Sequence, residues 1–132
     1  MSVFVDRLIR DHGYPVASSE NIEDLIAHQE CLVLFFANEP NRYPESNDVA
    51  VILPELHKAF ADRFAVAVVA RESEAALQER FPFPQWPALV FLRRGVQVGA
   101  ICKVRDWSEY RASIADMLAD SGEGQQIPSI NL

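Results

Sequence analysis

Blocks of two kinds follow one another along the chain, and they differ in the spacing of apolar and polar positions. Apolar residues three and four positions apart are typical of amphipathic helices, whereas unbroken runs of strand-forming residues favour buried strands. The first pattern predicts helices over residues 3–11, 20–28, 45–60, 73–80 and 107–120. The second predicts strands over residues 14–17, 31–37, 64–70, 88–92 and 96–103.

The apolar run over residues 31–37 predicts a central strand covered on both faces, because seven consecutive apolar residues leave no polar face. Helices and strands alternate through most of the chain, which predicts a largely parallel sheet with helices on both faces. The last two strands are joined only by Arg93-Arg94-Gly95 and should form an antiparallel hairpin. The expected fold class is therefore α/β with a mixed central sheet.

Local signals predict the ends of these elements. Ser19 is placed to cap the second helix, and Asp106 with Glu109 resembles a capping box before the last one. Pro15 points to an edge position for the first strand, and Pro54 predicts a kink inside the third helix. The inner stripe of the last helix should contain Trp107, Tyr110, Ile114, Met117 and Leu118.

The length of 132 residues and the hydrophobic fraction of 49% suit one domain with one core. We expect that domain over residues 1–120 and a flexible C-terminal tail over residues 121–132, because Gly122 ends the last helical pattern. No apolar run approaches the roughly 20 residues that span a bilayer, and the first residues show no cleavable signal pattern. For a bacterial chain, these features predict a cytoplasmic protein without stable membrane insertion.

The net charge of −7 is unevenly distributed along the chain. Residues 1–60 carry ten acidic and four basic side chains, whereas residues 61–132 carry nine and eight. An acidic first half disfavours nucleic acids and anionic membranes and favours a basic partner. The alternative is that this charge only keeps the protein in solution.

Two cysteines, Cys31 and Cys102, lie 71 residues apart in the sequence, and neither belongs to a CxxC pair. Both lie in apolar, strand-like segments, which favours buried thiols that pack as small hydrophobes. A disulfide and a reactive thiol stay open as alternatives. No histidine is at ligand spacing from either cysteine, so we predict no metal site.

The order of elements resembles thioredoxin, and particular residues support the resemblance. Phe35-Phe36-Ala37 matches the end of the strand before the thioredoxin dithiol, Pro54 the proline of the next helix, and Trp86-Pro87-Ala88 the cis-proline site. Arg94-Gly95 matches the closing hairpin turn, so the resemblance covers residues 14–120. It implies a thioredoxin-like fold with a cis bond before Pro87.

The dithiol itself is missing. Counting back from Pro54 places Ser46 and Val49 where thioredoxins have two cysteines. Thiol–disulfide exchange needs a thiolate, which neither side chain supplies, so we expect no enzyme activity and no cofactor. An oxidoreductase that uses Cys31 or Cys102 stays open, as does a purely structural module.

Three segments carry a finer resemblance: residues 35–40 (FFANEP), 47–56 (NDVAVILPEL) and 83–91 (FPQWPALVF). They are similar to hydrogenase expression/formation accessory proteins of the HyaE and HupG type, a bacterial family that resembles thioredoxin without the dithiol. The resemblance implies a chaperone for an uptake NiFe hydrogenase, which binds the twin-arginine signal peptide of the small-subunit precursor before export. Contacts with other hydrogenase accessory proteins and a homodimer stay open.

A twin-arginine signal has a basic start and an apolar middle, which an acidic surface beside apolar side chains would complement. In thioredoxins the peptide groove lies between the dithiol helix and the cis-proline loop, and the resemblance places the partner-binding residues there. They are Glu39, Arg42, Tyr43, Glu45, Ser46, Asp48, Phe83, Trp86 and Pro87, with Asn38 and Asn41 beside them.

Each of these features also has a purely structural interpretation. Glu45 and Asp48 favour a helix N-terminus through its dipole, whatever else they contact. The aromatic residues between 81 and 86 can pack beneath their loop instead of forming an exposed patch. A cis bond at Pro87 exposes backbone groups that can pair with an extended peptide, or it can simply preserve the fold.

Overall fold

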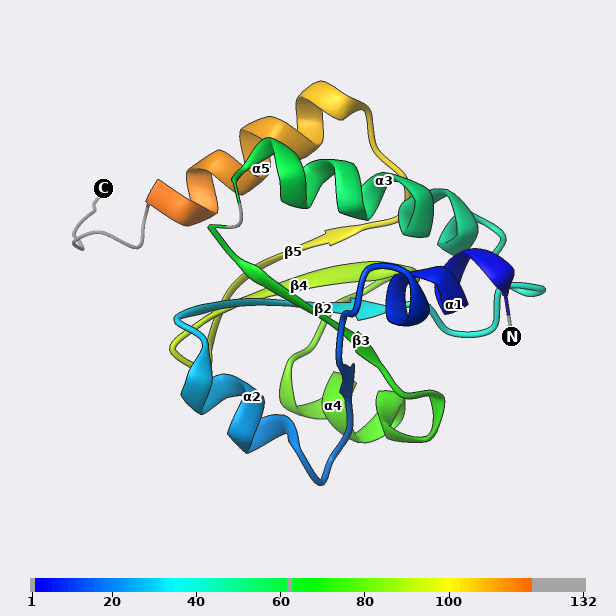
Figure 1. The fold of residues 1–132 in the computed structure, drawn as a ribbon, viewed down its shortest axis with the longest axis horizontal. Coiled ribbons are helices and arrows are strands. Elements are labelled where there is room, and N and C mark those ends of the chain that lie inside the picture. Colours follow the sequence, from blue (N-terminus) through cyan, green and yellow to red (C-terminus); the bar gives the residue numbers. More distant parts are fainter. Residues whose placement is uncertain (1, 62, 120–132) are drawn as a thin grey trace.

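The computed structural model describes residues 2–61 and 63–119, which form a sheet between two layers of helices (Figure 1). In chain order the elements are α1 (Val3–Arg10), β1 (Val16–Ala17), α2 (Ile22–His28), β2 (Cys31–Phe36), α3 (Glu45–Ala59), β3 (Ala65–Val69), the 3₁₀ turn η1 (Arg71–Ser73), α4 (Glu74–Arg80), β4 (Ala88–Arg93), β5 (Val96–Cys102) and α5 (Trp107–Ala119). The predicted alternation is confirmed. The tail predicted over residues 121–132 lies outside the described residues.

The five strands lie in the order β1-β3-β2-β4-β5, so the run over residues 31–37 supplies the central strand, as predicted. β1, β3 and β2 are parallel, whereas β4 and β5 form an antiparallel hairpin beside them. β2 pairs with β4 from Cys31 opposite Arg93 to Phe36 opposite Ala88. The sheet is therefore mixed, and β1 occupies the edge that Pro15 indicated.

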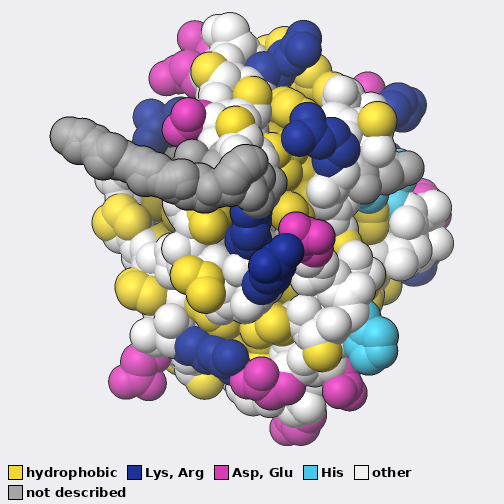
Figure 2. All heavy atoms as spheres, turned by 90° about the vertical axis from the view of Figure 1, so that its left-hand side faces the viewer, with side chains coloured by type: hydrophobic (Ala, Val, Ile, Leu, Met, Phe, Trp, Pro, Cys, Tyr) yellow, Lys and Arg dark blue, Asp and Glu magenta, His cyan; other side chains and the backbone are white. Residues whose placement is uncertain are grey.

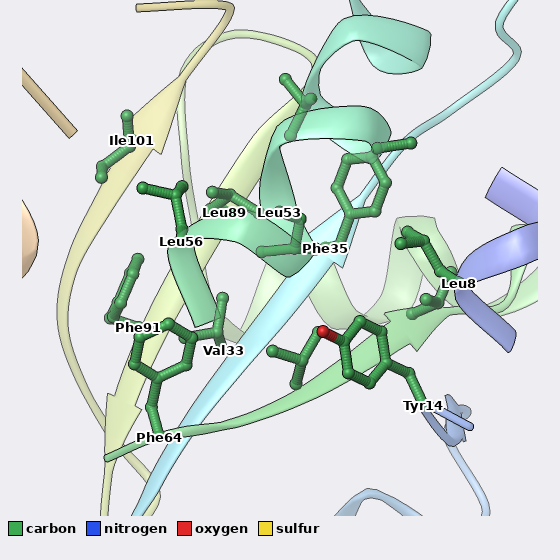
Figure 3. Packing of buried hydrophobic residues seen from close by; sticks show 14 of the residues in the cluster. Leu8, Tyr14, Val33, Phe35, Leu53, Leu56, Phe64, Leu89, Phe91 and Ile101 are labelled. Carbon is green, nitrogen blue, oxygen red and sulfur yellow. The ribbon is translucent and has the colours of Figure 1, made fainter. Parts of the chain in front are cut away.

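Side chains of β2 alternate between two cores, which explains why the strand is apolar throughout. Val33 and Phe35 belong to the cluster beneath α1, α3 and α5, where Figure 3 shows them between Leu53, Leu56 and Tyr14. Leu32, Leu34 and Phe36 belong to the cluster on the face that α2 and α4 cover. Every one of these β2 residues is at most 2% exposed, so truncation to alanine should cost about 2–5 kcal/mol.

The predicted cap of the second helix is wrong. α2 begins at Ile22, and Asn21 rather than Ser19 occupies the N-cap position. The Ser19 backbone N–H donates to Ser73 Oγ at 3.1 Å, which ties this loop to the start of α4. Asn21 Oδ1 accepts the Ser18 N–H at 2.7 Å, so a local turn replaces the cap.

The last helix fits its prediction except at one residue. Glu109 Oε1 accepts the Asp106 N–H at 3.1 Å, which confirms that half of the capping box. Tyr110, Ile114 and Leu118 are buried and Met117 is partly buried, but Trp107 is 43% exposed. Trp107 is the first residue of α5 and lies ahead of the turn that packs on the sheet.

α3 continues on both sides of Pro54, and the kink expected there stays a prediction. Within residues 2–61 and 63–119, none of the helices combines the length and the apolar character needed to cross a membrane.

Candidate functional site

The register between β2 and β4 brings two loops to one edge of the sheet. Phe36, the last residue of β2, pairs with Ala88, the first residue of β4. The segment after β2 therefore lies beside the segment before β4, although about fifty residues separate them in sequence. We call the surface made by residues 38–48 and 83–87 the cis-proline surface, because the Trp86–Pro87 peptide bond is cis, as the resemblance implied.

A chain of aromatic contacts leads from the core to this surface. The ring centroids of Phe36 and Phe83 are 4.7 Å apart, and those of Phe83 and Trp86 are 4.8 Å apart. Tyr43 approaches Trp86 from the other loop, with a centroid separation of 6.4 Å. Phe81 and Phe83 are buried, so they pack beneath the loop, whereas Tyr43 and Trp86 are half-buried and reach the surface.

The positions that match the thioredoxin cysteines lie inside the molecule. Ser46 has no exposed surface, and its Oγ donates a hydrogen bond to the Ala37 carbonyl. Val49 is 2% exposed and belongs to the core beneath α3. Ser46, proposed from the sequence as a contact residue, therefore fastens the loop to the start of α3. Pro87 is also buried.

Glu45 is engaged within the protein. Its Oε1 accepts the Val104 N–H at 2.8 Å, and its Oε2 lies 3.2 Å from the Lys103 Nζ. The hydrogen bond from Val104 is the main reason that the Glu45 pKa is lowered, and the charges of Lys103 and Arg105 act in the same direction. Glu45 thus joins the start of α3 to the segment after β5.

That segment also holds the cis-proline loop. Lys103, predicted as the end of the last strand, lies beyond β5 with a φ of 65°, and its N–H donates to the Pro87 carbonyl at 2.7 Å. Tyr110 donates from its hydroxyl to the Lys103 carbonyl at 3.3 Å. Burial raises the pKa of that tyrosine, so it stays a donor in the neutral pH range.

The remaining predicted contact residues are charged and accessible. Glu39 is half-buried, whereas Arg42 and Asp48 are exposed. The Glu39 carbonyl accepts the N–H groups of both Arg42 and Tyr43 at 2.9 Å, so the loop forms a tight turn. The Arg42 guanidinium lies 5.8 Å from the centroid of the Tyr43 ring. The structure thus brings Arg42, Tyr43 and Trp86 together, and Glu39 and Asp48 are accessible acids in the segment that carries Arg42 and Tyr43.

A buried carboxylate near this surface was missed from the sequence. Glu74, in the first turn of α4, is 3% exposed; its Oε2 accepts the Asn38 N–H at 2.8 Å, and Arg71 pairs with its Oε1 at 2.5 Å. Burial raises the Glu74 pKa, and the hydrogen bonds from Asn38 and Arg71 oppose that shift. In the sequence, an acid in a first helical turn indicates only dipole compensation.

The two cysteines lie far from one another. Cys31 begins β2, whereas Cys102 ends β5 opposite Ala88, which is the partner of Phe36 at the other end of β2. Five residues of strand, about 17 Å, therefore separate them along the sheet, which excludes a disulfide. Both thiols are free; Cys102 is buried and Cys31 only half-buried. No group of three or more potential metal-ligating side chains forms within the described part of the chain.

Comparison with known sequences identifies close relatives. The family model of the hydrogenase-1 expression protein HyaE matches residues 4–110. The hydrogenase expression/formation protein HoxO of Azotobacter vinelandii is 44% identical over 126 residues, covering 96% of this chain and 83% of that protein. HupG of Bradyrhizobium diazoefficiens, also a hydrogenase expression/formation protein, is 46% identical over 93 residues, covering 70% of this chain and 62% of that protein.

Comparison with solved structures agrees with the sequence relatives. A crystal structure described as a hydrogenase expression/formation protein HupG from Rhodopseudomonas palustris superposes with a TM-score of 0.59 at 39% identity, covering 83% of this chain and 99% of that one. Thioredoxin from Plasmodium falciparum superposes with a TM-score of 0.65 at 16% identity, covering 77% and 97%, which shows the fold alone. With its thioredoxin-like fold and its match to residues 4–110, the chain belongs to the HyaE/HupG/HoxO family of hydrogenase expression/formation proteins.

Proposed function

We propose that this hydrogenase maturation accessory protein is a non-catalytic chaperone. In this proposal it binds the small-subunit precursor of an uptake NiFe hydrogenase through the twin-arginine signal peptide. The binding takes place in the cytoplasm, because a precursor that still carries its signal peptide has not been exported. The family membership supports the hydrogenase role, and the cis-proline surface supports the mode of binding.

One observation carries the non-catalytic part of the proposal. Ser46 and Val49 occupy the dithiol positions, and both are buried. Thiol–disulfide exchange requires an accessible thiolate, and these positions offer neither a thiol nor access. Next to them, Tyr43 and Trp86 still reach the surface. A surface with accessible aromatic rings and no nucleophile at the dithiol positions is suited to binding.

Charge supports a basic peptide as the ligand. Glu39 and Asp48 have carboxylates on the cis-proline surface, whereas Glu45 is already paired with Lys103. Figure 2 shows the opposite end of the sheet, at the β4–β5 turn, where Lys and Arg side chains lie near the middle and most Asp and Glu side chains near the margins. That end is a poorer match for arginines.

The aromatic residues would accommodate the apolar middle of the signal peptide. Trp86 rests edge-on against Phe83, with an interplanar angle of 81°, and Phe83 is buried. A tryptophan supported in this way presents a large, rigid apolar surface at low entropic cost. We therefore expect Trp86 to be the main apolar contact and the two acids to select the arginines.

Two other functions have less support. A thiol oxidoreductase would have to use Cys102, which is buried, or Cys31, which lies at the opposite end of β2 from the cis-proline surface. A reductase assay with insulin or DTNB tests it, and turnover that Cys31→Ser abolishes would overturn our proposal. A structural module without a peptide ligand would instead show a self-interface that covers Trp86.

Calorimetric titration with a twin-arginine signal peptide from a hydrogenase small subunit, beside a twin-lysine peptide, tests the proposal. We expect tighter binding of the arginine peptide, because guanidinium groups pair with carboxylates in a bidentate manner. The double variant E39K/D48K should lose at least tenfold in affinity at about 0.05 M salt and less at about 0.5 M. The matched variant E55K/E79K reverses two other exposed acids and should bind as the wild type does.

Equal affinity of E39K/D48K and wild type would remove the electrostatic part of the proposal. Failure of both the peptide and the purified precursor to bind the wild type would remove the chaperone function itself.

A further inference from the structure

A cavity of about 380 Å³ opens where the parallel strands end. β2 and β3 run toward the side of the molecule at which α1 lies (Figure 1). The apolar walls of the cavity come from α1, through Val5 and Ile9, and from the strands, through Val16, Val68 and Val69. Its volume falls in the range of pockets that bind ligands, and its walls suit an apolar group.

The polar lining of this cavity is predominantly acidic. Glu39, Glu72 and Glu74 contribute carboxylates, whereas Arg71 contributes the only guanidinium among the residues that line it. The Glu74 carboxylate pairs with Arg71 and accepts the Asn38 N–H. The acids of the lining that are available to a ligand are therefore Glu39 and Glu72. Glu72 is exposed and Glu39 half-buried. The lining therefore favours a cationic group beside the apolar one.

The cavity and the cis-proline surface share a boundary. Asn38 and Glu39 line the cavity and also begin the segment that carries Tyr43. The positive φ of Asn38, 57°, and the hydrogen bond from its N–H to Glu74 fix the backbone at this boundary. An extended peptide that crosses Glu39 can therefore place one side chain in the cavity and continue toward Trp86.

We propose that this cavity is a binding pocket for an apolar side chain of the partner polypeptide, next to an arginine that pairs with Glu39 and Glu72. The inference rests on the proposed function and specifies it: the junction between the basic start and the apolar middle of the signal peptide lies over Glu39. Burial of one large apolar side chain in such a pocket corresponds to about a tenfold or greater gain in affinity.

The test fills the pocket without changing its charge. Val16 lines the cavity and is 38% exposed, so V16F can extend a ring into the cavity from its accessible side. The matched control is V96F, which makes the same change on β5 at a valine that is 66% exposed. Calorimetry with the twin-arginine peptide should show about tenfold weaker binding to V16F and an unchanged affinity for V96F, with circular dichroism verifying both folds.

A second pair of variants tests the charged part of the lining. E72K should weaken binding of the peptide several-fold at about 0.05 M salt, whereas E79K, which reverses an exposed acid of α4 outside the cavity, should not. A peptide whose first apolar residue after the arginines is replaced by serine should bind the wild type about tenfold more weakly. The same replacement should hardly affect binding to V16F, because the pocket is already filled.

The outcomes separate the pocket from the chaperone function. Equal peptide affinity of V16F and wild type would overturn the pocket and leave the proposed function standing. Failure of the peptide and the precursor to bind the wild type would overturn both. Self-association that V16F abolishes, with peptide affinity unchanged, would assign the cavity to a second copy of this chain and likewise overturn the inference.

Discussion

The first turns of α3 and α4 each contain a glutamate with similar contacts, but the two glutamates differ in burial. Glu45 and Glu74 each lie in the first turn of a helix, accept a backbone N–H from a segment that follows a strand, and pair with a cation. The Glu45 side chain is 38% exposed and its pKa is lowered, whereas Glu74 is 3% exposed and its pKa is raised. Burial is the largest cause of the shift at Glu74, whereas the hydrogen bond from Val104 is the largest at Glu45, so the two pKa values move in opposite directions.

The largest expected difference between Glu45 and Glu74 is in how much each contributes to the free energy of unfolding. Glu74→Ala leaves the half-buried Asn38 N–H without its acceptor and empties a buried position, whereas Arg71, 48% exposed, can turn to water, so we expect a loss of about 1–3 kcal/mol. Glu45→Ala removes contacts that water can replace, so we expect about 1 kcal/mol or less. Urea unfolding of both variants beside wild type measures the difference. Equal losses would show that burial does not distinguish the two sites.

The next largest difference is in the dependence of stability on pH. The raised pKa of Glu74 means that its contribution is present below the ordinary value of 4.5 and is lost as pH rises through the folded-state pKa. The lowered pKa of Glu45 means that its contribution is present above 4.5 and is lost as pH falls through the folded-state pKa. The two carboxylates therefore work in opposite directions on the acid side of neutrality.

Glu74→Gln and Glu45→Gln isolate these contributions. As pH rises from about 4 to about 7, the stability of wild type relative to E74Q should fall, whereas its stability relative to E45Q should rise. Unfolding free energies measured across that range decide the point. If both differences moved in the same direction, the assignment of opposite pKa shifts would be wrong.

The smallest expected difference concerns salt. A double-mutant cycle between Glu45 and Lys103 should give a coupling of about 0.2–1 kcal/mol that largely disappears at about 1 M salt, because the pair is exposed. The cycle between Arg71 and Glu74 should keep more of its coupling, since Glu74 is shielded from solvent. Identical salt dependence of the two cycles would contradict this distinction.

The pattern of apolar residues predicted the order of helices and strands, because the faces of the sheet that are covered decide which positions of a strand are apolar. Residues of β2 alternate between two cores, so periodicity alone indicated a strand covered on both faces. The short connection around Gly95 indicated the hairpin that the register confirms. Prediction was wrong where several local solutions compete, as at Ser19, where a turn through Asn21 takes the place of a cap.

The candidate site was predictable as a location but not as a set of contacts. Resemblance to thioredoxin indicated the loops around Tyr43 and Trp86, and the pairing of Phe36 with Ala88 brings them together. It did not indicate that Ser46 is buried. The bond between Asn38 and Glu74 joins residues 36 positions apart, and no local pattern reports such a contact.

Burial of Ser46 has a consequence for how this protein differs from a redox protein. A cysteine introduced at position 46 would occupy the buried position of the serine, where the Ser46 hydroxyl now donates to the Ala37 carbonyl. Its sulfur would be shielded from any disulfide that approached from solvent, and thiol–disulfide exchange needs an accessible thiolate. Recovery of thioredoxin chemistry would therefore require a different backbone path at the start of α3. The packing of this segment, and not only the missing cysteines, opposes thiol–disulfide exchange.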